Sequence, residues 1–196
     1  ANVRELEYIH ASLPAARVLV AASNHPGWIS KYVNERRFMN DPRNMVIGMR
    51  LFLMEHDELA SRNPSPEHVR PREAAHLFLE AHAPSVRCLE RDHEYFIPRT
   101  GDNRILVSMH GDEGPTGGST RSTKTFRRMN IRVFLGHNHS ATIDGPVWRV
   151  GVSKPLVPVP HYAQTPATGW TNSHGIIYKN GQRQLINIVG KRWHGQ

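Results

Sequence analysis

The sequence predicts a mixed α/β fold. Short apolar runs rich in β-forming residues alternate with helix-compatible stretches along the 196 residues. Three of the apolar runs end directly in polar segments that contain histidine, and an Asn-Gly pair separates two alternating segments near the C-terminus. These observations indicate strands that deliver side chains to the rim of a sheet, where α/β proteins usually keep their chemistry.

Composition indicates a globular protein. Hydrophobic residues make up 38% of the chain and the mean hydropathy is -0.53. A length of 196 residues fits one ordinary domain, so we expect a single domain over residues 1–196, and the sequence has no internal repeat or low-complexity segment. No apolar run reaches the roughly 20 residues that a membrane helix needs, and the N-terminus lacks the layout of a signal peptide. The chain is therefore expected in the cytoplasm, without a membrane partner.

Cysteine content and charge limit the kinds of metal site and of binding partner that we expect. Cys88 is the single cysteine, which excludes a disulfide framework and a cysteine-rich zinc site, and we expect it to be a buried thiol. Twenty-five Lys+Arg against 17 Asp+Glu give a formal charge of +8, which favours a polyanionic partner such as nucleic acid. The alternative is that the positive charge serves only to keep the protein soluble. The first candidates for contacting such a partner are Arg17, Arg36, Arg37, Arg121, Lys124, Arg127 and Arg128.

The first half of the chain predicts helices around one early strand. That strand covers residues 17–22, an apolar run that leads into the polar segment 23–27. The expected helices cover residues 3–13, residues 28–38, a stretch after the Asn-Asp-Pro cap at 40–42, and residues 67–82. In the third of these helices Pro42 would occupy the first helical position, which proline favours.

From residue 86 onward the pattern predicts strands. They are expected at residues 86–89, 94–97, 105–109, 131–135 and 147–152, and in a hairpin over 175–189. Asn180 and Gly181 lie between the two alternating strands of that hairpin, as a type I′ turn requires.

The three histidine-bearing segments follow predicted strands and begin at Ser23, His110 and Gly136. Strand ends at one edge of a sheet converge in space, so their side chains are expected to form one metal site. The candidate ligands are Asn24, His110, His137 and His139. Imidazole and amide oxygen suit divalent manganese, iron, zinc or nickel.

The spacing of His137 and His139 predicts how the two side chains are oriented. Alternate residues of an extended segment point the same way, so both imidazoles could face a two-metal centre. Gly136 beside them permits close backbone approach.

These segments resemble three motifs of the calcineurin-like metallophosphoesterases, usually written GNH(D/E), H and GHxH. The matching residues are Asn24-His25, His110-Gly111-Asp112 and Gly136-His137-Asn138-His139. Residues 110–151 and 173–188 are also similar to the phosphoesterase domain of DNA-transfer proteins from tailed bacteriophages. The resemblance implies a four-layer α/β/β/α metallophosphoesterase sandwich, of which this chain supplies the later part.

The resemblance also implies roles. Asn24, His110 and His137 would bind one metal ion and His139 the second, with Mn²⁺ the first choice and Fe, Zn or Ni the alternatives. His25 would act as a general acid toward the leaving oxygen. The two ions would polarise the phosphate and provide hydroxide near neutral pH.

Three further residues lie beside these motifs. Asp112 either orients a metal-bound imidazole or caps its loop, and the sequence leaves both readings open. Arg121 and Lys124 are candidates for contacting the substrate phosphate, beside a glycine-rich segment that lacks the ending of a nucleotide P-loop.

Two departures from the family bear on activity. No Asp-x-His or Gly-Asp motif precedes Asn24, so we expect a companion polypeptide or a cleaved N-terminal portion to carry them. Without those strands the sheet would present an unpaired edge and an uncovered apolar face. In addition, Pro26 stands where the family has an acidic residue, which leaves His25 without its usual orienting partner.

The leading hypothesis is a metal-dependent phosphoesterase that hydrolyses phosphodiesters as a DNA nuclease, in the host cytoplasm if a phage encodes it. The alternative is a noncatalytic metallophosphoesterase-like subunit of a phage or nucleic-acid assembly. A serine or cysteine hydrolase is disfavoured, because no G-x-S-x-G segment occurs and Cys88 has no adjacent base.

Overall fold

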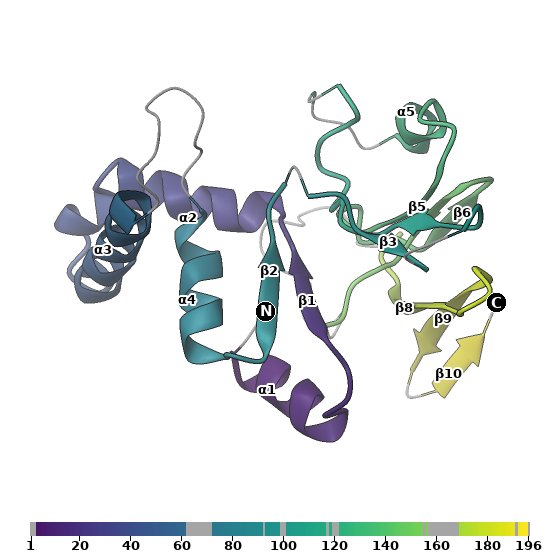
Figure 1. Cartoon of the computed structure of the whole chain (residues 1–196), viewed down its shortest axis with the longest axis horizontal. Coiled ribbons are helices and arrows are strands. Elements are labelled where there is room, and N and C mark those ends of the chain that lie inside the picture. Colours follow the sequence, from purple (N-terminus) through teal and green to yellow (C-terminus); the bar gives the residue numbers. More distant parts are fainter. Residues whose placement is uncertain are drawn as a thin grey trace. The chain divides into compact units, whose positions relative to one another are not determined.

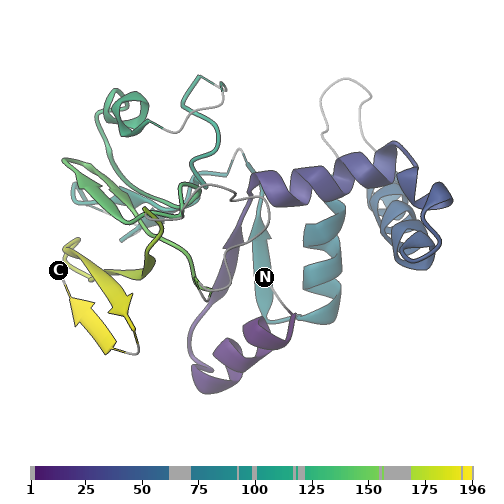
Figure 2. The same cartoon turned by 180° about the vertical axis from the view of Figure 1, so that it is seen from behind.

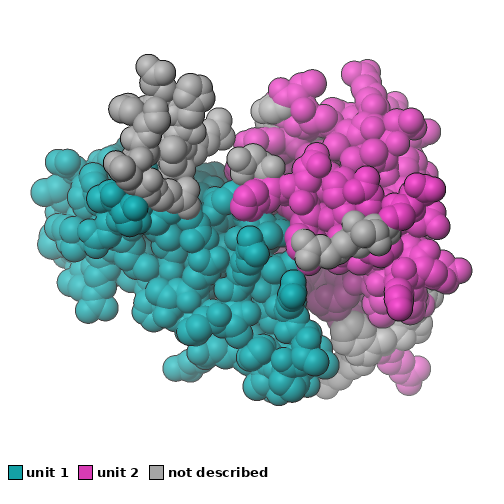
Figure 3. All heavy atoms as spheres, in the orientation of Figure 1, with its two compact units in different colours: residues 1–90 teal, residues 91–196 magenta. Residues whose placement is uncertain are grey.

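The structure, a computed structural model, has a mixed α/β fold, as the sequence predicts. It describes residues 3–61, 72–91, 93–98, 101–116, 118, 122–154, 156, 169–190 and 192–195. The chain divides into two compact units, Ala1–Glu90 and Arg91–Gln196, and each is described by itself (Figures 1 and 3). The single domain over residues 1–196 stays a prediction. In the described residues we find no helix with the length and apolar character needed to cross a membrane.

Unit 1 is built on two parallel strands with helices against them. Its elements are α1 (Val3–Ser12), β1 (Val18–Ala21), α2 (Asn24–Asn34), the 3-10 helix η1 (Arg37–Asn40), α3 (Met45–Ser61), α4 (Ala74–His82) and β2 (Val86–Leu89). Strand β1 pairs with β2 from Val18 opposite Val86 to Ala21 opposite Leu89. Helix α4 lies beside this pair in both views (Figures 1 and 2). The apolar core is formed by Leu6, Val18, Ala83, Val86 and Cys88.

Several helix boundaries in unit 1 differ from the prediction. The helix predicted over residues 28–38 ends at Asn34, and Arg37–Asn40 form the separate 3-10 helix η1 after Arg36, whose φ is 53°. Helix α2 begins at Asn24 and not at residue 28, because Pro26 falls in its first turn, where backbone N–H groups have no intrahelical partner to lose. Helix α3 begins at Met45, so Pro42 is not its first residue. The Asp41 carboxylate accepts hydrogen bonds from Asn44 Nδ2 (2.8 Å) and the Tyr32 hydroxyl (2.9 Å), and these fix a turn ahead of the helix.

The predicted helix over residues 67–82 is described from Ala74 onward as α4, and its first part lies outside the described residues. Glu55 supports the start of this helix, because its Oε1 accepts a hydrogen bond from the Ala74 backbone N–H at 2.8 Å. An acceptor at this position satisfies one of the donors that every helix leaves unpaired at its N-terminus.

Unit 2 contains two sheets. Its elements are β3 (Phe96–Ile97), β4 (Ile105–Leu106), α5 (Thr123–Arg127), β5 (Arg132–Leu135), β6 (Thr142–Asp144), β7 (Val147–Arg149), β8 (Asn172–Ile177), β9 (Arg183–Val189) and β10 (Arg192–Gly195). The larger sheet has the order β3-β4-β5-β7-β6, with β4, β5 and β7 parallel and the outer strands antiparallel. The smaller sheet, β10-β9-β8, is antiparallel.

The core of unit 2 lies against the larger sheet. Phe126 of α5 packs there with Leu106, Val133, Leu135 and Val147, all nearly inaccessible to solvent. Phe126 is the side chain that attaches the short helix, because the neighbouring Lys124 and Arg127 are exposed.

The hairpin of strands β8 and β9 is confirmed, but its turn is not type I′. Only Gly181 of the Asn-Gly pair has a positive φ, 79°, whereas type I′ requires it at both residues. Tyr178 N donates to Gln182 O (2.9 Å) and Gly181 N donates to Tyr178 O (2.8 Å), which closes a three-residue loop with glycine at the bulge.

Candidate metal and phosphoester site

Two of the three histidine-bearing segments meet in unit 2. Strands β4 and β5 are parallel neighbours, so their carboxyl ends lie at the same edge of the sheet. Past that edge, Gly136 N donates a hydrogen bond to the backbone oxygen of His110 at 2.9 Å. This bond joins the segment that follows β4 to the segment that follows β5.

The rings of His110 and His137 lie edge to face, with their centroids 5.2 Å apart and an angle of 75° between them. Both side chains are half-buried. Gly111, with a φ of 99°, makes the turn that follows His110, and a Cβ there would lie 3.3 Å from Cβ of Leu135. The structure therefore places two imidazoles together where the sequence predicts metal ligands.

The segment from Gly136 to His139 is not extended, contrary to the prediction. His137 and His139 have positive φ values of 68° and 61°, in the left-handed region. Asn138 N donates to Gly136 O at 2.9 Å, which closes a tight three-residue turn around His137. The alternation that would point both imidazoles the same way is therefore lost. Backbone strain of this kind in non-glycine residues clusters at functional sites.

His139 has different surroundings from the His110–His137 pair. Its ring lies edge to face against Trp170, with centroids 4.3 Å apart and an angle of 81°. Its backbone oxygen accepts a hydrogen bond from Thr171 N at 3.0 Å. His139 is thus held by the segment that precedes strand β8.

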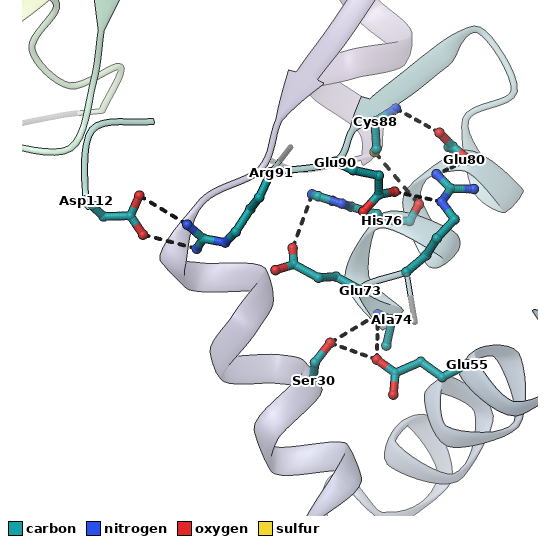
Figure 4. A network of polar contacts seen from close by, with 11 residues as sticks. Ser30, Glu55, Glu73, Ala74, His76, Glu80, Cys88, Glu90, Arg91 and Asp112 are labelled. Atoms are coloured by element: carbon teal, nitrogen blue, oxygen red, sulfur yellow. Dashed lines mark hydrogen bonds and ion pairs between the residues drawn. The ribbon is translucent and has the colours of Figure 1, made fainter. Parts of the chain in front are cut away.

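Asp112 lies two residues after His110 and is nearly inaccessible to solvent. Its carboxylate faces Arg91, with 3.0 Å from Oδ2 to Nη2 and 3.4 Å from Oδ1 to Nη1 (Figure 4). Burial raises the pKa of Asp112, but the hydrogen bonds and charge of Arg91 outweigh it and hold the pKa below its usual value. Sequence reasoning missed Arg91, because nothing near it in the sequence connects it to residue 112.

Asn24 and His25 belong to unit 1, where they are the first two residues of helix α2. The Asn24 Oδ1 atom is buried and accepts no hydrogen bond from the described residues. The His25 side chain is exposed and its ring centroid lies 4.9 Å from that of Trp28. Ser23 and His25 also contribute to a pocket of about 450 Å³, lined mainly by apolar side chains of α1, β1, α2, α3 and α4.

The donor types fit a divalent cation, since imidazole nitrogen and amide oxygen are ligands that manganese, iron and zinc accept. The predicted ligand set is divided, with Asn24 in unit 1 and the three histidines in unit 2. Within the described parts of the chain, no group of three or more His, Cys, Asp or Glu side chains is arranged to hold a metal ion.

The predicted basic residues lie at the surface where they are described. Lys124 is exposed on α5, whose N-cap Ser122 accepts a hydrogen bond from Lys124 N at 3.2 Å. Arg121 lies outside the described residues. Arg37 and Arg127 form ion pairs with Glu35 (2.6 Å) and Asp144 (3.3 Å).

A further cation that sequence reasoning missed contacts the same indole ring as His139. The ammonium of Lys154 is 4.9 Å from the centroid of the Trp170 ring, the same ring that contacts His139. Lys154 and Trp170 are too far apart in sequence for spacing to connect them.

Comparison with known proteins relates the chain to a phage protein. It is 26% identical over 178 residues to Protein A1 of Escherichia phage T5, a match that covers 88% of this chain and 29% of that protein. The chain thus spans less than a third of the relative's length. No protein-family model matches the chain, and no solved structure matches it.

Proposed function

We propose that this chain is the metal-binding part of a calcineurin-like metallophosphoesterase that hydrolyses phosphodiesters, acting as a DNA nuclease. The observation that supports it best is the edge-to-face pair of His110 and His137, delivered by adjacent parallel strands. The proposal implies the four-layer α/β/β/α sandwich as the finer description of the mixed α/β fold.

In this proposal Asn24, His110 and His137 hold one divalent cation and His139 the second, with Mn²⁺ preferred. When bound, the cations supply Lewis acidity toward the phosphate and a hydroxide near neutral pH. His25, exposed on the first turn of α2, donates a proton to the leaving oxygen. Because Pro26 replaces the acidic residue of the family, His25 would be oriented less firmly.

Nucleic acid is the substrate class that the charge of the chain favours. The formal charge of +8 attracts a polyanion over long range, and binding of that kind falls steeply as salt rises. A small phosphomonoester would gain little from this charge and would show weak salt dependence.

A companion polypeptide carrying the Asp-x-His and Gly-Asp motifs completes the proposal. Among the described residues, β1 hydrogen-bonds to β2 alone, and most of the exposed large apolar side chains belong to unit 1. Exposed apolar side chains that gather into a patch mark an interface, and we propose that the companion covers those of unit 1. The same surface and Pro26 also favour the second candidate, a noncatalytic subunit of a phage or nucleic-acid assembly.

The test uses the chain purified with any polypeptide that accompanies it. Metal content is measured by mass spectrometry, and hydrolysis of bis-p-nitrophenyl phosphate and of DNA is followed with Mn²⁺ and with EDTA. We expect two metal ions per complex and hydrolysis that EDTA abolishes. A complex that contains the companion but neither binds Mn²⁺ nor hydrolyses either substrate would be the noncatalytic subunit.

A further inference from the structure

We propose that Lys154 is a phosphate-contacting residue at this site, positioned by the indole ring of Trp170, which also contacts His139. The inference rests on the proposed function and adds to it a residue that binds the nucleic-acid strand. It starts from one ring with two contacts: the imidazole of His139 at 4.3 Å between centroids, and the ammonium of Lys154 at 4.9 Å from the centroid.

Each contact has a favourable geometry. The indole and the His139 imidazole meet at 81°, an edge-to-face arrangement that aromatic rings prefer over direct stacking. The ammonium of Lys154 lies within about 6 Å of the ring centroid, the range in which a cation is attracted to the face of tryptophan. The indole ring of Trp170 therefore contacts both a positively charged side chain and a predicted metal ligand.

Hydrogen bonds of Thr171 hold the segment that carries this ring. Thr171 N donates to His139 O (3.0 Å), while the Thr171 hydroxyl accepts from Ala141 N (2.7 Å). Thr171 O in turn accepts from Val152 N at 2.8 Å, two residues before Lys154. Thr171, which follows Trp170 directly, is thus hydrogen-bonded to the segment that carries His139 and to the segment that carries Lys154.

Gly151 makes this close approach possible. A Cβ at that position would collide with the backbone oxygen and carbon of Thr171, so a larger residue would push the Lys154 segment away. The backbone N–H of Gly151 also donates a hydrogen bond to Ser173 Oγ at 2.5 Å. The segment before Lys154 is thus hydrogen-bonded to Thr171 and Ser173.

The positive charge of Lys154 favours a negatively charged ligand. A phosphodiester carries one negative charge per linkage, and a lysine ammonium binds phosphate as a point charge. Lys154 is half-buried against the Trp170 ring that also contacts the predicted ligand His139, whereas Lys124, a candidate from sequence, is exposed on α5. The phosphodiester backbone of nucleic acid at the site is the ligand that we assign to Lys154.

The experiment compares Lys154→Gln, Lys154→Arg and Trp170→Leu with Lys179→Gln, which removes an exposed lysine of the same unit from the hairpin turn. Binding of a fluorescein-labelled DNA oligonucleotide is measured by anisotropy across a salt series, and hydrolysis of bis-p-nitrophenyl phosphate is measured in parallel. The proteins are purified with any companion, and their thermal midpoints are recorded.

We expect Lys154→Gln to weaken DNA binding several-fold and to reduce the slope of log affinity against log salt by about 1, the loss of one phosphate contact. Lys154→Arg should restore the slope, Trp170→Leu should resemble Lys154→Gln, and Lys179→Gln should bind like the original chain. If Trp170→Leu fails to fold, the Gln and Arg variants of Lys154 still decide the matter.

Equal slopes for Lys154→Gln and Lys179→Gln, in a protein that binds DNA and hydrolyses the phosphodiester, would overturn this inference and leave the proposed function intact. A parent complex that neither binds DNA nor hydrolyses the phosphodiester would overturn both. Loss of DNA binding in Lys154→Gln with unchanged hydrolysis of the small substrate supports a role in holding the strand.

Discussion

His137 combines a strained backbone with a position beside a second imidazole. Its φ of 68° costs a non-glycine residue on the order of 1–2 kcal/mol relative to glycine. We expect His137→Gly to lose bound metal and hydrolysis while the free energy of unfolding of the metal-free protein stays equal or rises by about 1 kcal/mol. Metal analysis and urea denaturation in EDTA measure the two effects.

The control for this prediction is His93→Gly, which removes an exposed histidine of the same unit whose backbone has no positive φ. It should keep metal and activity. Full metal content in His137→Gly would show that His137 is not a ligand.

Burial lowers the reactivity of the Cys88 thiol. The side chain is 3% exposed, and burial, together with the negative charge of Glu80, raises the pKa of its thiol to about 12 from an ordinary value of 9.0. We expect iodoacetamide to leave native protein unlabelled at pH 8 and to modify one thiol after unfolding. Rapid labelling of folded protein would contradict this burial.

The same shift has a consequence for stability at high pH. The thiol ionises near pH 9 in the unfolded chain but only near 12 in the folded one, so its contribution is complete below pH 9. Stability should then fall as pH rises from 9 toward 12, because only the unfolded state releases the proton there. The difference between Cys88→Ala and the parent chain in urea denaturation at pH 8 and pH 10 measures this contribution.

At the scale of elements, the β8–β9 hairpin depends on Gly181. Its φ is 79°, and a Cβ there would lie 2.8 Å from both Cβ and the backbone oxygen of Asn103. Gly190 has a similar φ of 61°, but a Cβ there would meet nothing within 4 Å. Alanine at Gly190 would therefore introduce backbone strain alone, whereas alanine at Gly181 would add a steric clash with Asn103.

We expect Gly190→Ala to lower the free energy of unfolding by about 1 kcal/mol, the cost of the left-handed conformation for alanine. Gly181→Ala should lower it by a further 1–3 kcal/mol or so, because Asn103 has to move. Urea denaturation of both variants measures the difference. Equal losses would mean that the hairpin turn does not pack on Asn103.

The sequence predicted the elements better than their ends. Periodicity and β-forming residues located strands such as Val86–Leu89 and Arg132–Leu135, because those signals are local. The turn at residues 136–139 has distant hydrogen-bond partners at both ends: Val150 N donates to Leu135 O just before it (2.9 Å), and Thr171 N donates to His139 O (3.0 Å). No local pattern contains that information, so the extended conformation was the wrong prediction.

For the whole molecule, the sequence led to the predicted ligand types but not to the residues that contact them, and the ligand assignment itself stays a prediction. His110 and His137 follow strands that it located, so their meeting could be expected. The contacts of Arg91 with Asp112 and of Lys154 with Trp170 join residues far apart in the chain, and only the fold reveals them.

The exposed apolar surface of unit 1 leads to a prediction about assembly. Val46 of α3 is 67% exposed and Val189 of β9 is 65% exposed, so they are matched in residue type and exposure but lie in different units. If a companion polypeptide covers unit 1, Val46→Glu buries a charge in that interface, and a buried charge without a partner costs several kcal/mol.

We expect Val46→Glu to reduce co-purification of the companion at least tenfold and to lower the metal content with it. Val189→Glu adds the same charge at equal exposure and should change neither. Self-association of the chain without its companion, measured by sedimentation velocity, should also fall in Val46→Glu, because the charge interrupts apolar surface that is then uncovered. If both variants retain the companion equally, α3 lies outside the interface and the exposed apolar side chains of unit 1 need another explanation.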